Sequence, residues 1–298
     1  MEDASVLTEV FLPLGLAVIM GTLGLSLVIA DFKRVVVAPR GVAIGMANLL
    51  VIAPLLAFAV AELFSLDPLL AVGLVLLGAS PGGTLANLLT HLARGETALS
   101  VTMTGVSSVL SVITVPLYLG LAIDHFGAGI SDDVSMVGTA ITVFAITVIP
   151  LSIGMAYRAR RPERALSIEP RLKRVALAVF VLIIAAAVAE EWERLSASFG
   201  DVALAALTLN VAAMSVSFTV ARLARLSDRQ ATAIAMELGI HNATLAIAVA
   251  TTVATELALP AAVYSAFMFI TAGSFARVMY ARNGGAGLRA AHAEGRVG

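Results

Sequence analysis

The segment GASPGGTLANLLTHLARG, residues 78–95, lies within a long apolar run and contains the residues that decide the fold. Pro81 removes a backbone hydrogen-bond donor, and the two glycines that follow it disfavour helix. A helix that enters this segment is therefore predicted to stop there and to begin again near Thr84. A kink in a continuous helix is the simpler alternative, because neighbouring groups in a membrane protein can satisfy the freed backbone groups.

A second apolar segment, MELGIHNATLAIAVA (236–250), shows a similar interruption. Gly239 lies between Glu237 and the pair His241–Asn242, and the residues after the two breaks are alike, GTLANLL and ATLAIAV. Broken helices at matching positions of an inverted repeat are typical of secondary transporters, whose site lies where the half-helices meet. The two segments together therefore favour the paired broken helices of a transporter over two unrelated helix kinks.

The composition indicates that the bilayer is the solvent. Hydrophobic residues make up 59% of the 298 residues, charged residues 13%, and the mean hydropathy is +0.97. A soluble protein of this size could not cover that much apolar surface with polar groups. The net charge of −1 excludes a generally basic nucleic-acid-binding protein. The absence of cysteine excludes disulfides, thiolate metal sites and cysteine nucleophiles.

Nine apolar runs are long enough to cross a bilayer as helices. The predicted fold class is therefore an all-α polytopic membrane protein with nine transmembrane helices, forming one transporter domain over 8–281. The small, polar residues 282–298 predict a disordered cytoplasmic tail. The third and eighth runs carry the two breaks and, being five apart, have opposite orientations. The runs are 8–30, 41–63, 69–92, 97–122, 134–157, 171–190, 201–221, 230–253 and 260–281.

The basic residues predict the orientation of these spans. With alternate loops assigned to one side, that side receives eighteen of the nineteen lysines and arginines, and the other side receives only Arg194. The positive-inside rule then places the N-terminus outside and the C-terminus in the cytoplasm, in a cell membrane. The acidic N-terminus lacks the positive region of a cleaved signal peptide, so the first span is expected to remain in the mature protein.

Glu237 is the one carboxylate near the middle of a predicted span. A charge at that depth costs about 2.5–3.5 kcal/mol on insertion scales and needs a partner. Asn87 follows the first break, and Ser100 and Thr104 lie four apart on one helix face. Carboxylate, amide and hydroxyl oxygens suit Na⁺ better than a soft transition metal. The alternatives are a protonated structural Glu237, interhelical hydrogen bonds from Ser100 and Thr104, and a purely structural or a pH-sensitive His241.

The stretches ASPGGTLANLLTHLARGETALSVTMTGVSS (79–108) and MELGIHNATLA (236–246) resemble the bile acid:sodium symporter family, and the chain looks like its nine-helix bacterial kind. The resemblance implies two inverted repeats with two broken helices that cross. It also implies a core, here 41–122 and 201–281, and a panel, here 8–30, 134–157 and 171–190. Organic anions are then expected to bind in the cleft between core and panel.

The resemblance also implies residues for two sodium sites. For the first site, one serine ligand of the family is replaced by Ala86, and the other ligands match. For the second site, two family glutamines are replaced by His241 and Leu49, although the neighbouring Asn48 offers an amide. One Na⁺ site is therefore expected, with a second in question. The residues implied for sodium are Asn87, Ser100, Thr104, Glu237, Leu238, Ile240 and His241.

Candidate substrate-binding residues follow from the same resemblance. Many relatives carry Trp-His-Asn on the last helix, where this chain has Phe267, Met268 and Phe269 without hydrogen-bonding groups. A bile-acid-like substrate is therefore not required, and a small carboxylate such as pantoate or a 2-oxo acid fits equally well. The candidates are Thr84, Asn242, Asn48, Met268 and Phe269.

The function predicted from these residues is sodium-coupled symport of an organic anion by alternating access, with the lipid bilayer and the anion as partners and no obligatory protein partner. A proton-coupled or uncoupled carrier on the same fold is the alternative that His241 favours. An intramembrane enzyme is disfavoured, because the sequence has no Gly-x-Ser-Gly nucleophile, no Gly-x-Gly-Asp carboxylate pair and no His-Glu-x-x-His zinc helix. A channel or sensor is disfavoured by the paired breaks.

Overall fold

The computed structural model describes residues 12–130, 134–190 and 192–293, and all of its named elements are helices. Within these ranges five helices are long and apolar enough to cross a membrane, and a sixth is added if one bent pair counts as a span. The chain is thus an all-helical polytopic membrane protein. The five helices coincide with the second, fourth, fifth, seventh and ninth predicted spans: Pro39–Leu63, Thr97–Phe126, Met136–Arg160, Gly200–Leu223 and Thr255–Gly284.

The five long helices contain local irregularities that divide some of them into shorter elements. Five-residue π-helical turns interrupt the second and fifth spans, and a 3₁₀ turn leads into the ninth. The elements are α4 (Pro39–Ala47), η2 (Asn48–Ile52), α5 (Ala53–Leu63), α8 (Thr97–Phe126), α9 (Met136–Val143), η3 (Phe144–Val148), α10 (Ile149–Arg160), α12 (Trp192–Leu223), η4 (Thr255–Ala258) and α15 (Leu259–Ala293).

The first span is bent rather than continuous. Its two parts, α2 (Leu12–Ser26) and α3 (Ile29–Val37), meet at an angle of 67°. The backbone N–H of Val28 donates to Oδ2 of Asp31 at 2.8 Å, which starts a new helix with a charged face. The predicted span 8–30 therefore ends as an apolar helix at Ser26 in the structure, and residues 8–11 lie outside the described ranges.

Both predicted breaks are present. The third predicted run forms α6 (Pro68–Ala79) and α7 (Thr84–Leu92), and the eighth predicted run forms α13 (Asp228–Gly239) and α14 (Ala243–Ala250). Side-chain caps fix where the outer halves begin: Asp67 accepts from the N–H of Leu69 and Ser227 from that of Gln230. None of these four helices is long enough alone to cross a bilayer.

Two helices extend beyond the predicted limits. Helix α11 (Pro162–Glu190) contains the sixth predicted span but begins earlier, in a charged segment. Helix α15 continues to Ala293, so residues 282–293 are helical where the sequence predicted a disordered tail. Residues 294–298 of that predicted tail lie outside the described part of the chain.

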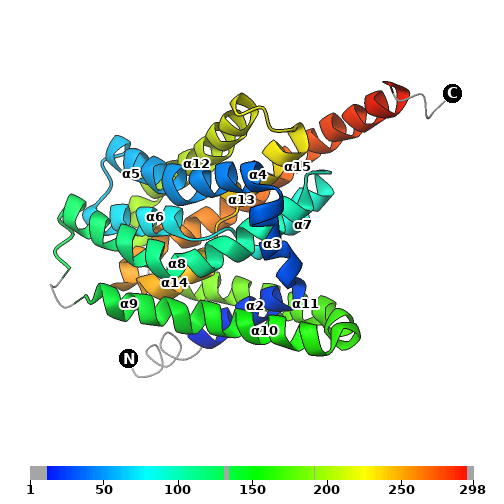
Figure 1. Ribbon diagram of the computed structural model, residues 1–298. Helices are drawn as coiled ribbons and strands as arrows, with labels where there is room; N and C mark the ends of the chain where they lie inside the picture. The colour runs from blue at the N-terminus through cyan, green and yellow to red at the C-terminus, as the bar shows by residue number, and fades with distance from the viewer. Residues whose placement is uncertain (1–11, 131–133, 191, 294–298) are drawn as a thin grey trace.

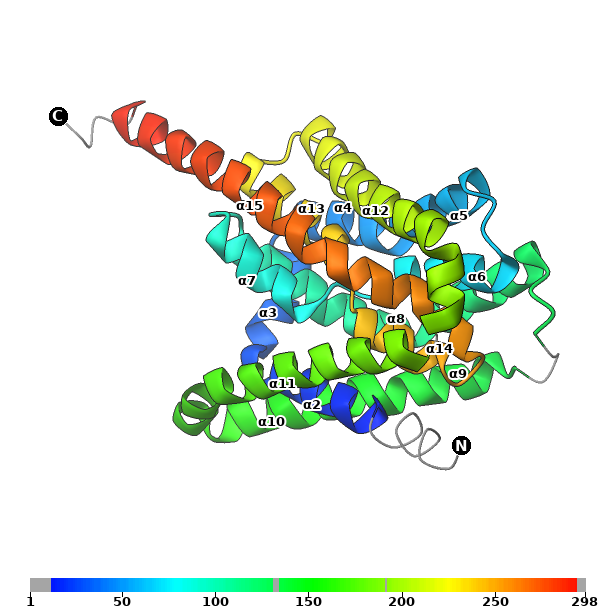
Figure 2. The ribbon, with the colours of Figure 1, turned by 180° about the vertical axis from the view of Figure 1, so that it is seen from behind.

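The helices form two layers (Figures 1 and 2). Helices α2, α9, α10 and α11 lie on one side in both views, and the two broken helices, α8, α12 and α15 lie on the other. In the first layer α2 and α10 approach closely, since a Cβ at Gly24 or Gly154 would overlap backbone atoms of the facing helix. This layer contains the segments that the sequence assigns to the panel, and the second layer contains those assigned to the core.

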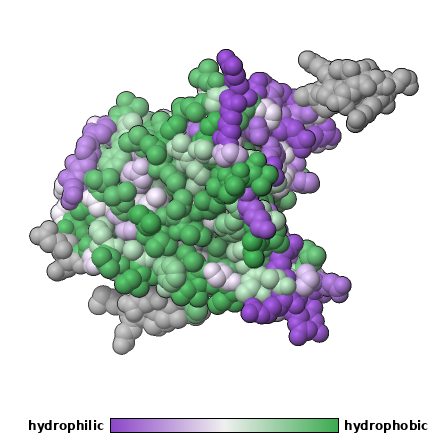
Figure 3. All heavy atoms as spheres, in the orientation of Figure 1, coloured by the Kyte–Doolittle hydropathy of each residue, from purple (hydrophilic) through white to green (hydrophobic). Residues whose placement is uncertain are grey.

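The surface has the pattern of a membrane protein. A broad hydrophobic band covers the face in Figure 3, and hydrophilic residues gather at its two edges. Loops predicted to be cytoplasmic contact one another, so they lie at the same end of the molecule, as the charge count requires. Their contacts are Arg34 with Glu96, Arg40 with the carbonyl of Ala224, Arg229 with the carbonyl of Arg94, and Arg94 with the hydroxyl of Tyr280.

Candidate functional site

The two breaks meet at the centre of the second layer. The N–H of Gly83 donates to the carbonyl of Ile240 at 2.6 Å, and the N–H of Asn242 donates to the carbonyl of Pro81 at 2.8 Å. These bonds form an antiparallel bridge between Gly82 and His241. The unwound backbone of each break is therefore satisfied by the other, which explains how irregular chain can lie at membrane depth.

The half-helices present charge-complementary ends at this crossing. Helices α7 and α14 begin there, so their partly positive N-termini favour an anion, whereas the carbonyls that end α13 favour a cation. Asn242 caps α14, because its Oδ1 accepts from the N–H of Leu245 at 3.1 Å and from the Thr244 hydroxyl at 2.7 Å. This cap leaves the Asn242 amide nitrogen with only a weak 3.8 Å contact to Sδ of Met20.

The four residues predicted for the first sodium site are brought together. Oε1 of Glu237 lies 2.5 Å from the hydroxyl of Ser100 and 2.9 Å from that of Thr104, which is also 3.0 Å from Oε2. Oδ1 of Asn87 lies 2.8 Å from the Ser100 hydroxyl and 3.3 Å from the Thr104 hydroxyl. We call these four residues the oxygen cluster. Glu237, Ser100 and Thr104 are fully buried.

The oxygen cluster contains more acceptors than its protons can serve. Ser100 and Thr104 supply one hydroxyl proton each, yet both hydroxyls lie within hydrogen-bond distance of Glu237 and of Asn87 Oδ1. In the described residues no lysine or arginine forms an ion pair with Glu237. A cation held between these oxygens would balance both deficits, so the cluster fits a hard cation.

Gly82 gives the carboxylate its space. A Cβ at this position would overlap Oε2 of Glu237, and one at Gly83 would press on the carbonyls of Ile240 and His241. The Pro-Gly-Gly sequence therefore serves two purposes: proline and glycine interrupt the helix, and the missing side chains admit the carboxylate and the second break.

The residues implied for a second sodium site have other partners. The carbonyl of Leu238 accepts from the Tyr264 hydroxyl at 3.3 Å, and that of Ile240 accepts from Gly83. His241 donates from Nδ1 to the carbonyl of Ser80 at 3.0 Å, because a carbonyl only accepts, and its buried Nε2 has no partner among the described residues. Leu49 is a buried hydrophobic residue.

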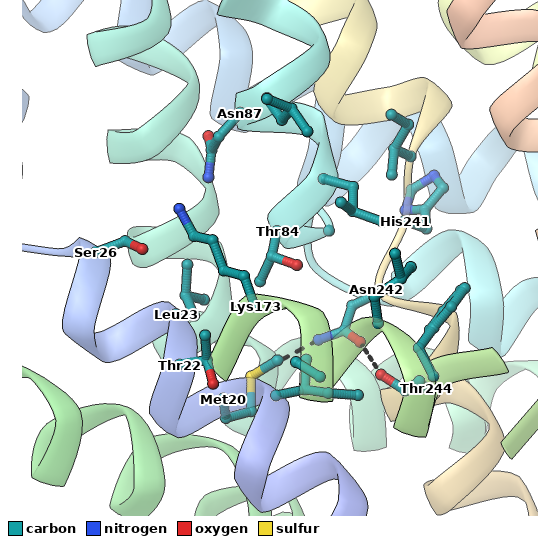
Figure 4. A pocket seen from close by; sticks show the side chains of 18 of the residues that line it. Met20, Thr22, Leu23, Ser26, Thr84, Asn87, Lys173, His241, Asn242 and Thr244 are labelled. Carbon is teal, nitrogen blue, oxygen red and sulfur yellow. Dashed lines mark hydrogen bonds between the residues drawn. The ribbon is translucent and has the colours of Figure 1, made fainter. Parts of the chain in front are cut away.

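A pocket of about 400 Å³ lies between the two layers, next to the crossing. Residues of α2 and α11 line it from one layer, and residues of α7, α14 and α15 line it from the other. Figure 4 shows Thr84, Asn242 and Asn87 around it together with His241. Most of its lining is apolar, including Met20, Leu23, Phe180 and Met268.

Three of the five predicted substrate-binding residues line this pocket: Thr84, Asn242 and Met268. Asn48 does not; it lies buried in the π-helical turn η2, where its amide nitrogen donates to the carbonyl of Ile44 at 2.7 Å. Phe269 is also outside the lining, but its ring packs edge-on against that of Phe180, which lines the pocket.

Two cationic residues of the pocket, Lys173 and Arg174 on α11, were not predicted as site residues. Their positive charges are visible in the sequence, but there they were used only to predict the orientation of the spans. Lys173 pairs with Glu169 at 2.6 Å, and the Ser26 hydroxyl, which also lines the pocket, donates to the same carboxylate at 2.8 Å. Burial alone would raise the pKa of Glu169, but the Lys173 and Ser26 hydrogen bonds and the charges of Lys173 and Arg158 outweigh it and lower that pKa.

Comparisons with known proteins assign the chain to a family. Residues 13–198 match the family described as the sodium bile acid symporter family. The chain is 31% identical to an uncharacterized sodium-dependent transporter of Bacillus subtilis, over 86% of this chain and 78% of the relative. It is 29% identical to a probable chloroplastic sodium/metabolite cotransporter of Oryza sativa subsp. japonica, over 93% of this chain and 65% of the relative.

A human relative is named for a bile acid. The chain is 29% identical to the ileal sodium/bile acid cotransporter of Homo sapiens, over 81% of this chain and 69% of the relative. The chain thus spans about two thirds to three quarters of the length of these relatives. The family match covers more than half of the chain, and the predicted resemblance to this family is confirmed. The chain belongs to the sodium bile acid symporter family.

Proposed function

We propose that the protein is a secondary transporter that couples the entry of one Na⁺ to the uptake of a small organic anion by alternating access. The observation that carries this proposal is the pair of complementary sites at the crossed breaks. An oxygen cluster with a buried carboxylate lies beside the crossing, and a pocket with two cationic residues lies between the layers next to it. The names of the relatives, which include a sodium-dependent transporter and a sodium/bile acid cotransporter, support the same coupling.

The ion is proposed to be Na⁺ at the oxygen cluster. One carboxylate with neutral hydroxyl and amide oxygens suits a hard monovalent cation. The described residues contain no group of three or more histidines or acidic residues placed to hold a metal ion. We propose a single ion, because the implied second site has lost both glutamine ligands.

The substrate is proposed to be an amphipathic carboxylate. The pocket volume is within the usual range for small-molecule sites of about 300–1,000 Å³. Lys173 and Arg174 offer charge to a carboxylate, and Thr84 and Asn242 offer hydrogen bonds at the crossing. Pantoate and 2-oxo acids fit this description, and so do bile-acid-like molecules. Such a ligand would touch both layers, so its binding would favour closure of the cleft between them.

The topology is proposed to comprise nine spans, with inverted repeats built around the two broken helices, the N-terminus outside and the C-terminus in the cytoplasm of a cell membrane. Each broken helix counts as one span, as does the bent pair α2–α3. The contacts between the basic segments support this count, because they place three predicted cytoplasmic loops and the end of the ninth span together.

Single cysteines introduced at Asp124 and Ser167 are expected to label from opposite sides of the membrane. Both residues are exposed, one at the end of α8 and the other in the charged part of α11, and the chain has no cysteine of its own. An impermeant thiol reagent should reach Asp124→Cys from outside in intact cells and Ser167→Cys only after the membrane is opened. Labelling of both from outside would rule out the nine-span topology.

Replacement of Lys173 by Gln is expected to weaken binding of the anion and to leave sodium binding unchanged. The effect should be several-fold, because the ammonium group is exposed and partly screened. The measurement is the concentration dependence of uptake, with sodium stabilisation of the purified protein measured in parallel. Arg171→Gln on the same helix, outside the pocket lining, is the control. Equal losses in both variants would show that Lys173 acts only through the general field of α11.

Uptake into proteoliposomes tests the proposed function. Pantoate, pyruvate and taurocholate would be supplied with an inward sodium gradient, with a proton gradient in potassium buffer, and with neither. We expect concentrative uptake of at least one of them only with sodium. Uptake driven by the proton gradient would favour the alternative of a proton-coupled carrier. The buried Nε2 of His241, which has no partner among the described residues, is the observation that favours this alternative. Uptake that never exceeds equilibrium would exclude both forms of coupling.

A further inference from the structure

Asn87 belongs to both sites. It lies on α7, in the first turn after the break, and its Oδ1 contacts both hydroxyls of the oxygen cluster. The same residue lines the pocket. Its Nδ2 has no hydrogen-bond partner in the described part of the chain. In Figure 4 this nitrogen end of the amide faces the same part of the pocket as the Lys173 ammonium group.

The two ends of this amide have opposite requirements. Oδ1 only accepts hydrogen bonds and Nδ2 only donates them. If Ser100 and Thr104 both donate to Glu237, they present lone pairs to Asn87, and these attract Nδ2 rather than Oδ1. A cation within the oxygen cluster reverses this preference, because it attracts Oδ1. The orientation of the amide therefore depends on whether the cluster holds a cation.

We propose that Asn87 is the residue that couples the two ligands. Bound Na⁺ holds Oδ1 in the oxygen cluster, which turns the two N–H groups of Nδ2 into the pocket, where they donate to the carboxylate of the substrate beside Lys173. This inference rests on the proposed function and adds a residue-level cause for the coupling. Because coupling free energies are reciprocal, a bound carboxylate also tightens sodium binding by holding the amide in the same orientation.

The test separates a bridging residue from a simple ion ligand. Asn87→Asp keeps an oxygen for the ion and removes the N–H groups that face the pocket. Thr104→Val removes an ion ligand that is fully buried and does not line the pocket. Thr97→Asp places the same new charge on the pocket wall, at the start of α8, where Thr97 has no hydrogen bond to the oxygen cluster in the described part of the chain. Asn87→Ser provides an uncharged variant without an amide nitrogen if the aspartate variant does not fold.

The readout is equilibrium binding of the radiolabelled carboxylate that the wild type takes up best from the panel above, measured on purified protein as sodium is raised to saturation. We expect Thr104→Val to recover wild-type anion affinity at saturating sodium. Asn87→Asp should stay at least about 10-fold weaker at every sodium concentration, since a hydrogen bond to a charged group has been lost. It should still be stabilised by sodium against heat. Thr97→Asp should lose clearly less affinity than Asn87→Asp.

Two results would overturn the inference while leaving the proposed function intact. One is full recovery of anion affinity by Asn87→Asp at saturating sodium, which would make Asn87 an ion ligand only. The other is loss of sodium stabilisation in that variant, because the retained oxygen would then not be the contact that matters. By contrast, wild-type protein that binds none of the carboxylates in a sodium-dependent way would contradict the proposed function itself.

Discussion

Replacement of Glu237 by Gln is expected to abolish sodium-driven uptake while the protein still folds and inserts. The amide keeps the volume of the carboxylate and can still hydrogen-bond Ser100 and Thr104. It removes the one negative charge of the oxygen cluster, and loss of one partner of a buried ion pair costs about 3–5 kcal/mol. That cost corresponds to a loss of sodium affinity of about 100-fold or more.

Two measurements check this expectation. Uptake under a sodium gradient should fall to the level of empty liposomes, and sodium should no longer raise the melting temperature, as a ligand of the folded state otherwise does. Glu62→Gln is the matched control, because Glu62 is exposed, lies at the end of α5 and, among the described residues, has its one ion pair with His125. A Glu237→Gln variant that still concentrates the anion would show that the carboxylate is a structural group.

Replacement of Gly82 by Ala is expected to be the most damaging change at a position with no functional side chain. The added Cβ would overlap Oε2 of Glu237, an atom to which the Thr104 hydroxyl donates, while the Ser100 hydroxyl donates to Oε1 of the same carboxylate. Either the carboxylate leaves the oxygen cluster or the pairing of the two breaks opens. Overpacking of a well-packed site costs about 1–3 kcal/mol, so we expect a lower melting temperature together with loss of sodium stabilisation.

Gly273→Ala on α15 is the control for this variant. Nothing lies within 4 Å of a Cβ at that position, and alanine in a helix interior is more favourable than glycine by about 0.5–1 kcal/mol. The control should therefore match or exceed wild-type stability, with normal uptake. If Gly82→Ala retains sodium stabilisation and uptake, the break has room that the structure does not show, and the position assigned to the carboxylate is wrong.

The sequence was sufficient to predict both breaks, the first from local signals and the second from Gly239 together with the likeness of the residues that follow to those after the first break. Pro81 and the glycines beside it prevent a regular helix whatever surrounds them. The gathering of Asn87, Ser100 and Thr104 around Glu237 was also predicted, because a buried carboxylate needs partners; in the structure Ser100 and Thr104 contact Glu237, and Asn87 contacts their hydroxyls. The antiparallel pairing of Gly82 with His241 could not be predicted, because it depends on how two segments far apart in the chain pack together.

Tertiary packing explains the remaining differences. The sequence marks Lys173 and Arg174 as loop charges, and only the packing of α11 against α2 shows that they reach a pocket. Asn48 was a substrate candidate by its place in the sequence, yet the π-helical turn around it directs its amide nitrogen to the carbonyl of Ile44. The bend after Ser26 could not be predicted from a proline, because none lies there. It depends on the cap that Asp31 provides for α3.

The central claim is that the oxygen cluster around Glu237 holds the coupling ion. Equilibrium binding of radioactive sodium to the purified protein tests this claim most directly, with wild type, Thr104→Val and Glu237→Gln compared with and without the transported carboxylate. We predict saturable binding of one sodium ion to the wild type, tightened by the carboxylate, weaker binding to Thr104→Val and none to Glu237→Gln. Sodium binding to Glu237→Gln with wild-type affinity would contradict the claim and place the ion elsewhere in the protein.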